Sequence, residues 1–176
     1  PETKWDLLAA KDVPDLPARY YAQIENLDDN FARLAAALRE TGQWENTVVL
    51  FFSDHGEMMG SHGLYQKQLP YEESINIPLI VHDPRLPPER RGTVVDAPVC
   101  TEDLYPTTLG LAGAAADASK PGLDLGPCIR GAGTPAREGV YLEFVEEDRP
   151  PMPLYGHAWR GLRTRRWKYV VLDGQP

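Results

Sequence analysis

Apolar residues recur at spacings of three and four between residues 18 and 41. These spacings place the apolar side chains on one face of a helix, and Gly42 then supplies a C-terminal stop. The pattern predicts an amphipathic helix over residues 18–41, preceded by an irregular lead-in over residues 1–17. The predicted apolar face consists of Tyr20, Ile24, Leu27, Phe31, Leu34 and Leu38.

A strand pattern follows at residues 47–52, where β-branched, aliphatic and aromatic side chains run without a charged residue. Such a run is typical of a buried strand, and a helix followed closely by a buried strand is half of a β-α-β unit. Two further strands are predicted over 77–82 and 93–99. Because proline cannot donate to a sheet, Pro78 predicts either an edge position or a strand that begins at Leu79.

The C-terminal part of the chain has a different pattern. A helix is predicted over 102–112, with Thr101 and Asp103 as capping residues, and a loop rich in Ala, Gly and Pro follows over 114–137. Strand-like runs at 139–144, 158–164 and 167–172 have no helices between them, which predicts an antiparallel sheet whose last two strands form a tight hairpin at Arg165-Arg166.

The fold class predicted from this order of elements is α/β. Residues 18–113 form part of a sheet with flanking helices, and its strands are expected to be parallel. Residues 114–176 form a loop and a small antiparallel subdomain.

Candidate chemistry lies directly after the strand at 47–52, because ligands of open α/β sheets bind beyond the carboxyl ends of the strands. Asp54 offers a hard carboxylate oxygen, and His55 can act as hydrogen-bond partner, proton carrier or metal ligand. Gly56 allows the backbone to turn sharply. The alternative is structural: Asp54 caps the strand end and His55 is a surface residue.

Lys67 lies thirteen residues after Asp54, at the far end of a glycine-rich loop, so it can fold back toward the same point. A lysine beside a bound divalent ion would attract an anionic ester. The alternative for Lys67 is a solvated surface position. His62, in the same loop, either contacts a leaving group or holds the loop together.

Other polar and aromatic residues are interpreted as structural. The side chains of Asp28 and Asp29 diverge on their helix and form no paired-carboxylate site. Five further acidic residues are interpreted as surface charge: Glu72, Glu73, Glu146, Glu147 and Asp148. The segment 146–157 is interpreted as a flexible crossover. Trp159 and Trp167 are interpreted as core or sheet-face residues.

Composition narrows the function classes. A chain of 176 residues that is 42% hydrophobic is long enough for a globular core, and no run in it resembles a membrane span. The formal net charge of -8 argues against nucleic-acid binding, since only residues 160–168 are locally basic.

Cys100 and Cys128 can pair or stay free. The chain opens at Pro1 and closes after a strand-like run, so we expect it to be part of a longer polypeptide, and no localisation is predicted.

Several segments carry a resemblance to a known family: 20–38, 46–56, 60–67, 77–80, 103–113 and 163–169. Together they resemble the second half of a sulfatase. The resemblance implies an alkaline-phosphatase-like α/β fold with a small antiparallel C-terminal subdomain, and hydrolysis of a sulfate ester at a divalent cation. It implies that Asp54 is a metal ligand, that His55 is a second ligand or polar neighbour with a catalytic part, and that Lys67 contacts the sulfate group. Calcium is the expected ion and manganese the alternative, because calcium prefers oxygen to histidine nitrogen.

The nucleophile of the family is a formylglycine made from a Cys/Ser-x-Pro-x-Arg segment, and the chain contains no such segment. We therefore expect a fragment that does not turn over sulfate esters alone. A phosphonate or phosphate ester hydrolase of the same superfamily is the nearest alternative. An alternative of another class is a noncatalytic binding or assembly module, and an exposed apolar patch on such a piece is expected to favour self-association.

Overall fold

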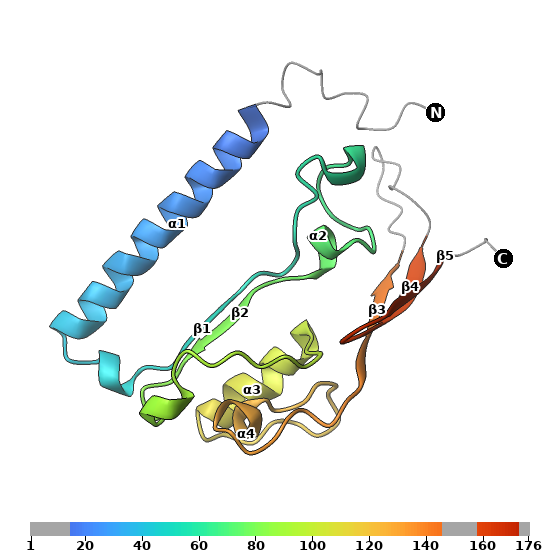
Figure 1. Cartoon of the computed structure of the whole chain (residues 1–176). Helices are drawn as coiled ribbons and strands as arrows, with labels where there is room; N and C mark the ends of the chain where they lie inside the picture. The colour runs from blue at the N-terminus through green and yellow to red at the C-terminus, as the bar shows by residue number, and fades with distance from the viewer. Residues whose placement is uncertain (1–14, 146–157, 173–176) are drawn as a thin grey trace. The chain divides into compact units, whose positions relative to one another are not determined.

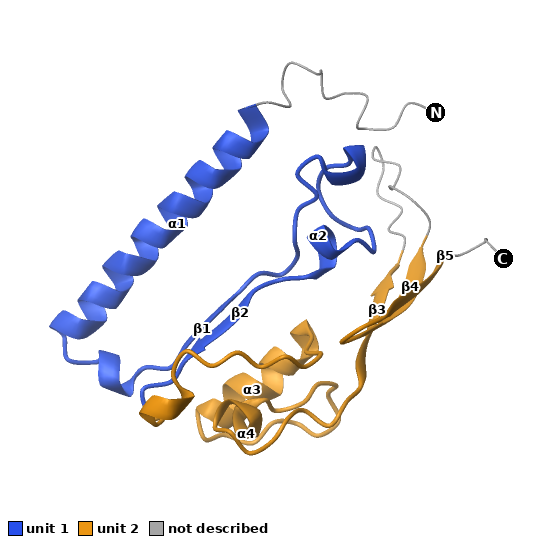
Figure 2. Ribbon diagram, viewed as in Figure 1, with its two compact units in different colours: residues 1–84 blue, residues 85–176 orange. Residues whose placement is uncertain are grey.

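The computed structural model describes residues 15–145 and 158–172. The chain divides into two compact units, residues 1–84 and residues 85–176 (Figure 2). Most of the predicted lead-in, the crossover at 146–157 and its acidic residues Glu146, Glu147 and Asp148 lie outside the described residues. The predicted domain organisation, with its boundary at 113/114, stays a prediction.

Helix α1, Asp15–Glu40, confirms the predicted amphipathic helix (Figure 1). It begins three residues before the predicted start, because Pro17 falls in its first turn, where the missing N–H has no intrahelical partner in any case. Gly42 ends the helix as expected: its φ of 69° is left-handed, and the N–H of Gln43 donates to the carbonyl of Leu38 at 2.8 Å.

Strands β1, Val49–Phe52, and β2, Leu79–His82, pair in the first unit, and β2 begins at Leu79 as predicted. They run antiparallel, with Val49 opposite His82 and Phe52 opposite Leu79, so the expectation of parallel strands is wrong for this pair. Parallel neighbours need a crossover, usually a helix, whereas the connection over 53–78 contains only the 3-10 turn Ser61–Gly63 and the four-residue helix α2, Glu72–Ile75.

Apolar side chains of the first unit remain exposed in this chain. Phe51, Phe52 and Ile80 on the β1–β2 pair are 46%, 47% and 62% exposed. The face of α1 is likewise exposed along most of its length, although Ala35 is buried. Among the described residues, the faces that the sequence predicts to be buried therefore lack the cover that they need. The exposed residues of α1 are Tyr20, Tyr21, Ile24, Leu27, Phe31 and Leu34.

The second unit begins with irregular chain. Residues 93–99, predicted as a strand, form none: Val94 is 90% exposed and Pro98 interrupts the run, so the apolar residues there have no partner strand. The predicted helix at 102–112 is confirmed as the 3-10 turn Thr101–Asp103 followed by helix α3, Leu104–Leu111. The predicted loop at 114–137 contains one short helix, α4, Gly126–Ile129.

The predicted antiparallel sheet at the end of the chain is confirmed (Figure 1). Its strands are β3, Gly139–Phe144, β4, Trp159–Thr164, and β5, Lys168–Leu172, in that order. The side chain of Thr164 closes the β4–β5 turn by accepting a hydrogen bond from the N–H of Trp167 at 2.8 Å, and neither turn arginine has a positive φ.

The two tryptophans that were interpreted as core or sheet-face residues differ. Trp159 is buried, as expected, but Trp167 is 68% exposed in the β4–β5 turn, so that part of the prediction is wrong. A turn position has no facing layer, and the ring of Trp167 instead contacts the guanidinium of Arg166, whose Cζ atom lies 5.0 Å from the ring centroid. None of the helices in the described part of the chain combines the length and the apolar content needed to cross a membrane.

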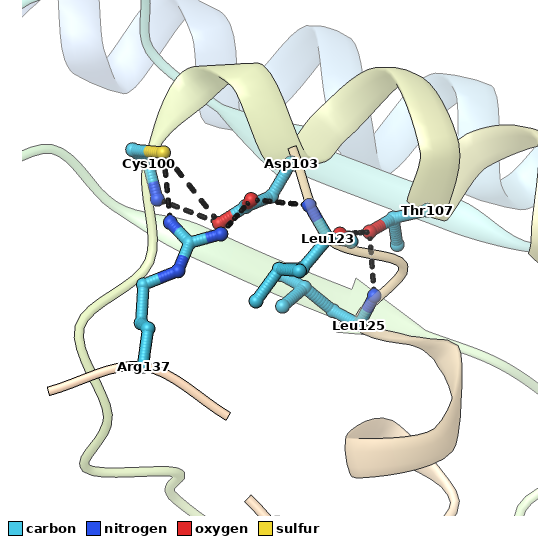
Figure 3. Close-up of polar contacts among 6 residues, drawn as sticks. All are labelled: Cys100, Asp103, Thr107, Leu123, Leu125 and Arg137. Atoms are coloured by element: carbon cyan, nitrogen blue, oxygen red, sulfur yellow. Dashed lines mark hydrogen bonds and ion pairs between the residues drawn. The ribbon is translucent and has the colours of Figure 1, made fainter. Parts of the chain in front are cut away.

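A buried ion pair holds the second unit together (Figure 3). The carboxylate of Asp103 is fully buried and pairs with the guanidinium of Arg137. It also accepts hydrogen bonds from the N–H groups of Cys100, at 2.9 Å, and Leu123, at 2.8 Å. Because a buried charge is tolerated only when it is paired and hydrogen-bonded, these contacts fix the start of α3 against two later loop segments.

The two cysteines are free. Burial raises the pKa of the Cys100 thiol, and the hydrogen bond from Arg137 opposes this rise only in part. Cys100 is therefore a thiol at neutral pH, and its environment is not that of an activated thiolate nucleophile. Its place beside Asp103 is structural.

Candidate functional site

Asp54 and His55 follow β1 directly, as predicted, and their side chains face each other. The carboxylate of Asp54 is 85% exposed, with its Oδ2 atom 3.7 Å from Nε2 of His55. Its other oxygen, Oδ1, accepts a hydrogen bond from the N–H of His55 at 3.0 Å. The turn after the strand thus presents one carboxylate oxygen and one imidazole nitrogen side by side.

A hydrogen bond to the main chain sets the tautomer of His55. Its Nδ1 atom lies 2.7 Å from the carbonyl oxygen of Gly56, which can only accept. In the neutral imidazole, Nδ1 therefore carries the proton and Nε2 keeps a lone pair on the side of Asp54. Metal-binding histidines usually have this arrangement, in which the nitrogen that does not bind metal donates to a carbonyl or carboxylate. The geometry favours the ligand interpretation of His55 over that of an ordinary surface residue.

The described residues offer only part of a metal shell. Asp54 and His55 suit a divalent cation by their chemistry, but no group of three or more His, Cys, Asp or Glu side chains comes together in the described part of the chain. Calcium takes about six to eight oxygen ligands, so these two residues would need further ligands from elsewhere.

Gly56 packs against the backbone of α2 more closely than any other residue could. Its N–H donates to the carbonyl of Ser74 at 2.9 Å. A Cβ atom at this position would lie 1.9 Å from the carbonyl oxygen of Glu73. The glycine after His55 is thus required for its close contact with α2. Its φ is not positive, so the structure shows tight packing here and not a left-handed turn.

We expect Gly56→Ala to lower the free energy of unfolding by about 1–3 kcal/mol, the usual cost of overpacking. Thermal unfolding followed by circular dichroism measures the loss. Ser61→Ala is the control, because it places the same methyl side chain in the same loop at a residue that has no positive φ. Equal losses for both variants would show that the contact with α2 is not the cause.

The loop over residues 57–68 is closed on itself by Glu57, which the sequence reasoning missed. The N–H of Met58 donates to the carbonyl of Gln66 at 2.8 Å. The carboxylate of Glu57 accepts from the N–H of Gln66, and from that of Met59 at 3.4 Å. Met58 is fully buried under this closure. The only sequence signal for this loop-closing role of Glu57 is its position between Gly56 and the apolar pair Met58-Met59.

The backbone of this loop is strained. Met59, His62, Gln66 and Gln68 have φ values of 50°, 56°, 68° and 84°, and they are all of the non-glycine residues with positive φ in the described part of the chain. Such conformations cost of order 1–3 kcal/mol each and cluster at binding and catalytic sites. Gln66 and Gln68, two of the four, flank Lys67. The direction of the Cα–Cβ bond of Lys67 is therefore set by backbone conformations that are unfavourable in free energy and that the rest of the loop must maintain.

Lys67 and His62 are not brought to the Asp54–His55 pair by any contact. Lys67 is exposed, and no hydrogen bond or ion pair joins its side chain to another residue of the described ranges. His62 is directed at helix α2, where it stacks on Tyr71 with ring centroids 4.3 Å apart. The structure therefore favours the loop-holding interpretation of His62 and leaves the ammonium group of Lys67 available for an anion.

Two protein-family models match the chain. The model described as Sulfatase matches residues 4–114, and the model described as N-sulphoglucosamine sulphohydrolase, C-terminal, matches residues 60–174. The Asp54–Lys67 loop lies within the first match. The second match includes the loop from Gly60 onward and the antiparallel sheet.

Individual proteins similar to this chain include a sulfatase and a phosphonate monoester hydrolase. An arylsulfatase of Clostridium perfringens is 36% identical over 127 residues, which are 72% of this chain and 26% of the relative. The phosphonate monoester hydrolase of Agrobacterium radiobacter superposes with a TM-score of 0.83 at 28% identity, over 96% of this chain and 35% of that one.

A second solved protein, in complex with its substrate D-glucosamine-2-N,6-O-disulfate, gives a TM-score of 0.72 at 27% identity, over 89% of this chain and 31% of that one. The chain thus spans roughly a third or less of each of these three relatives.

Proposed function

Because this chain belongs to the sulfatase family, we propose that it is the C-terminal part of the catalytic domain of a metal-dependent sulfate ester hydrolase. The observation that carries the proposal is the loop from Asp54 to Lys67: an adjacent carboxylate and imidazole at a strand end, followed by a closed, strained loop that presents a lysine. The predicted α/β, alkaline-phosphatase-like fold class is that of its structural neighbours.

In the proposed site, Asp54 and His55 would hold a divalent cation, with calcium expected and manganese as the alternative. The bound cation would supply positive charge that stabilises the ester and its transition state. Lys67 would donate hydrogen bonds to a sulfate oxygen and stabilise the charge that develops there. Nε2 of His55, with its lone pair set by the bond from Nδ1 to Gly56, would serve as ligand or polar neighbour.

The nucleophile, a formylglycine by family resemblance, would come from a polypeptide segment outside these 176 residues. The exposed apolar faces of α1 and of the β1–β2 pair support this, because in a complete domain they would pack against further sheet and helices. The share of each relative that the chain spans supports it too. We expect the chain alone to be inactive, and to self-associate through these faces. The intact enzyme is the polypeptide that joins this chain to the nucleophile segment.

A phosphonate monoester hydrolase is the second candidate, favoured by the superposition on the Agrobacterium enzyme. Both activities act on an anionic tetrahedral ester, and the Asp54–Lys67 loop suits either one. The substrates expected from the relatives are small-molecule esters of sulfate, or alternatively of phosphate or phosphonate.

We expect the intact enzyme to hydrolyse 4-nitrophenyl sulfate and to lose this activity after chelation, because its site would lack the cation that stabilises the ester charge. Calcium or manganese should restore it. The experiment is a spectrophotometric assay of 4-nitrophenyl sulfate and of 4-nitrophenyl phenylphosphonate with and without chelator. Faster hydrolysis of the phosphonate ester would establish the second candidate. No hydrolysis of either ester would favour the noncatalytic module, whereas hydrolysis unaffected by chelation would contradict the metal-dependent role of the Asp54–His55 pair.

A further inference from the structure

The tip of the 57–68 loop is fastened to helix α2. Nε2 of His62 lies 3.6 Å from Oε1 of Glu73, within ion-pair distance when the imidazole is protonated. The His62 ring also stacks on the ring of Tyr71, the residue before the helix, with an angle of 22° between the ring planes. His62 reaches this position with a left-handed backbone, which costs free energy for a residue other than glycine.

The base of the same loop is fastened to the same helix. Gly56, next to His55, donates its N–H to the carbonyl of Ser74. Helix α2 thus contacts the chain at two points: beside the Asp54–His55 pair, and at the tip that precedes Lys67. Helix α2 is a single turn, closed by the N–H of Asn76, which donates to the carbonyl of Glu72. This turn connects the Asp54–His55 end of the candidate site with the loop tip that precedes Lys67.

We propose that Glu73 and His62 are positioning residues, which act through the loop to fix Lys67 relative to Asp54 and His55. The inference rests on the proposed function, because it assigns Lys67 an anion to bind. In this role His62 acts on the position of Lys67 and does not contact the leaving group of the ester.

The energetics favour a positioning role over a purely stabilising one. The side chains of His62 and Glu73 are 51% and 35% exposed, and ion pairs this exposed contribute little to global stability. The loop, however, holds several strained residues that relax when an anchor is lost. A displacement of a catalytic group by about 1 Å is enough to cost on the order of 100-fold in rate. Loss of the anchor should therefore move Lys67 without unfolding the unit.

A double-mutant cycle in the intact enzyme tests this role. We expect His62→Ala to lower kcat for 4-nitrophenyl sulfate by about 10- to 100-fold, with the melting temperature and the metal content unchanged. In a Lys67→Ala background the same change should lower kcat no further, because the group that it positions is gone. His62→Gln, which can still donate to Glu73, should recover most of the loss. Glu45→Gln, an exposed glutamate in the same unit, is the control.

Equal losses from His62→Ala in both backgrounds would overturn the positioning role. Inactive wild-type enzyme would instead remove the proposed function, and full activity in Lys67→Ala would remove the anion-binding role of Lys67 and with it the positioning role. The second measurement does not depend on activity: amide hydrogen exchange of this chain with Glu73→Gln. We expect the Met58 and Gln66 amides, whose hydrogen bonds close the loop, to exchange at least about 10-fold faster than in wild type, while the β1–β2 amides are unchanged. Unchanged exchange at Met58 and Gln66 would overturn the inference by itself.

Discussion

Replacement of Lys67 by alanine should lower kcat/KM of the intact enzyme for 4-nitrophenyl sulfate by about 100- to 1,000-fold, the usual loss when one preorganised charge-stabilising donor is removed. Lys67 is exposed, and its side chain makes no hydrogen bond or ion pair with other described residues, so the loss should come without a change in melting temperature. Steady-state kinetics with thermal unfolding of the same preparations measure both quantities.

Lys120→Ala is the matched control for this change. Lys120 is also an exposed loop lysine, but it lies in the second unit and away in sequence from the Asp54–Lys67 loop. We expect its replacement to leave kcat/KM within about twofold of wild type, since surface substitutions rarely have large effects. If Lys67→Ala behaves like Lys120→Ala, the solvated-surface interpretation of Lys67 is correct and its anion-binding role is not.

Arg137→Ala should lower the free energy of unfolding by about 3–5 kcal/mol, because it leaves the fully buried carboxylate of Asp103 without its partner charge. Urea denaturation followed by fluorescence measures the loss. The double variant Arg137→Met with Asp103→Asn should recover part of it, since the amide removes the unpaired charge and keeps one oxygen that can accept from a neighbouring N–H group.

The control is Arg165→Ala, which breaks the ion pair between Arg165 and Asp96. Their side chains are 63% and 76% exposed, so the expected loss is only about 0–1 kcal/mol. A loss from Arg137→Ala as small as that from Arg165→Ala would mean that the carboxylate of Asp103 finds water or another donor, and that the pair does not hold the second unit together.

The elements that the sequence predicted well are those specified by local pattern. Spacings of three and four with Gly42 gave α1, and runs of alternating or apolar residues gave the three strands of the C-terminal sheet. Asp54 and His55 were found because they adjoin each other and follow a strand, so their proximity required no knowledge of the tertiary structure. The resemblance to sulfatases rested on these same segments.

Features that depend on contacts distant in sequence were missed. An apolar run predicts burial but not strand direction, which is why β1 and β2 were expected to be parallel. Glu73 was interpreted as surface charge, although it contacts His62 eleven residues earlier in the chain. Asp103 was predicted as a cap, which it is, but its pairing with Arg137, 34 residues away, has no local signal.

The central claim is that the loop from Asp54 to Lys67 is one part of a metal-dependent active site. A crystal structure of the intact enzyme grown with manganese and sulfate tests it most directly, because anomalous scattering locates the ion. The account predicts a manganese peak at coordination distance from a carboxylate oxygen of Asp54, roughly 2.0–2.3 Å, and a sulfate oxygen about 2.7–3.2 Å from Nζ of Lys67. An ion bound elsewhere, with Asp54 and Lys67 both facing solvent, would contradict it.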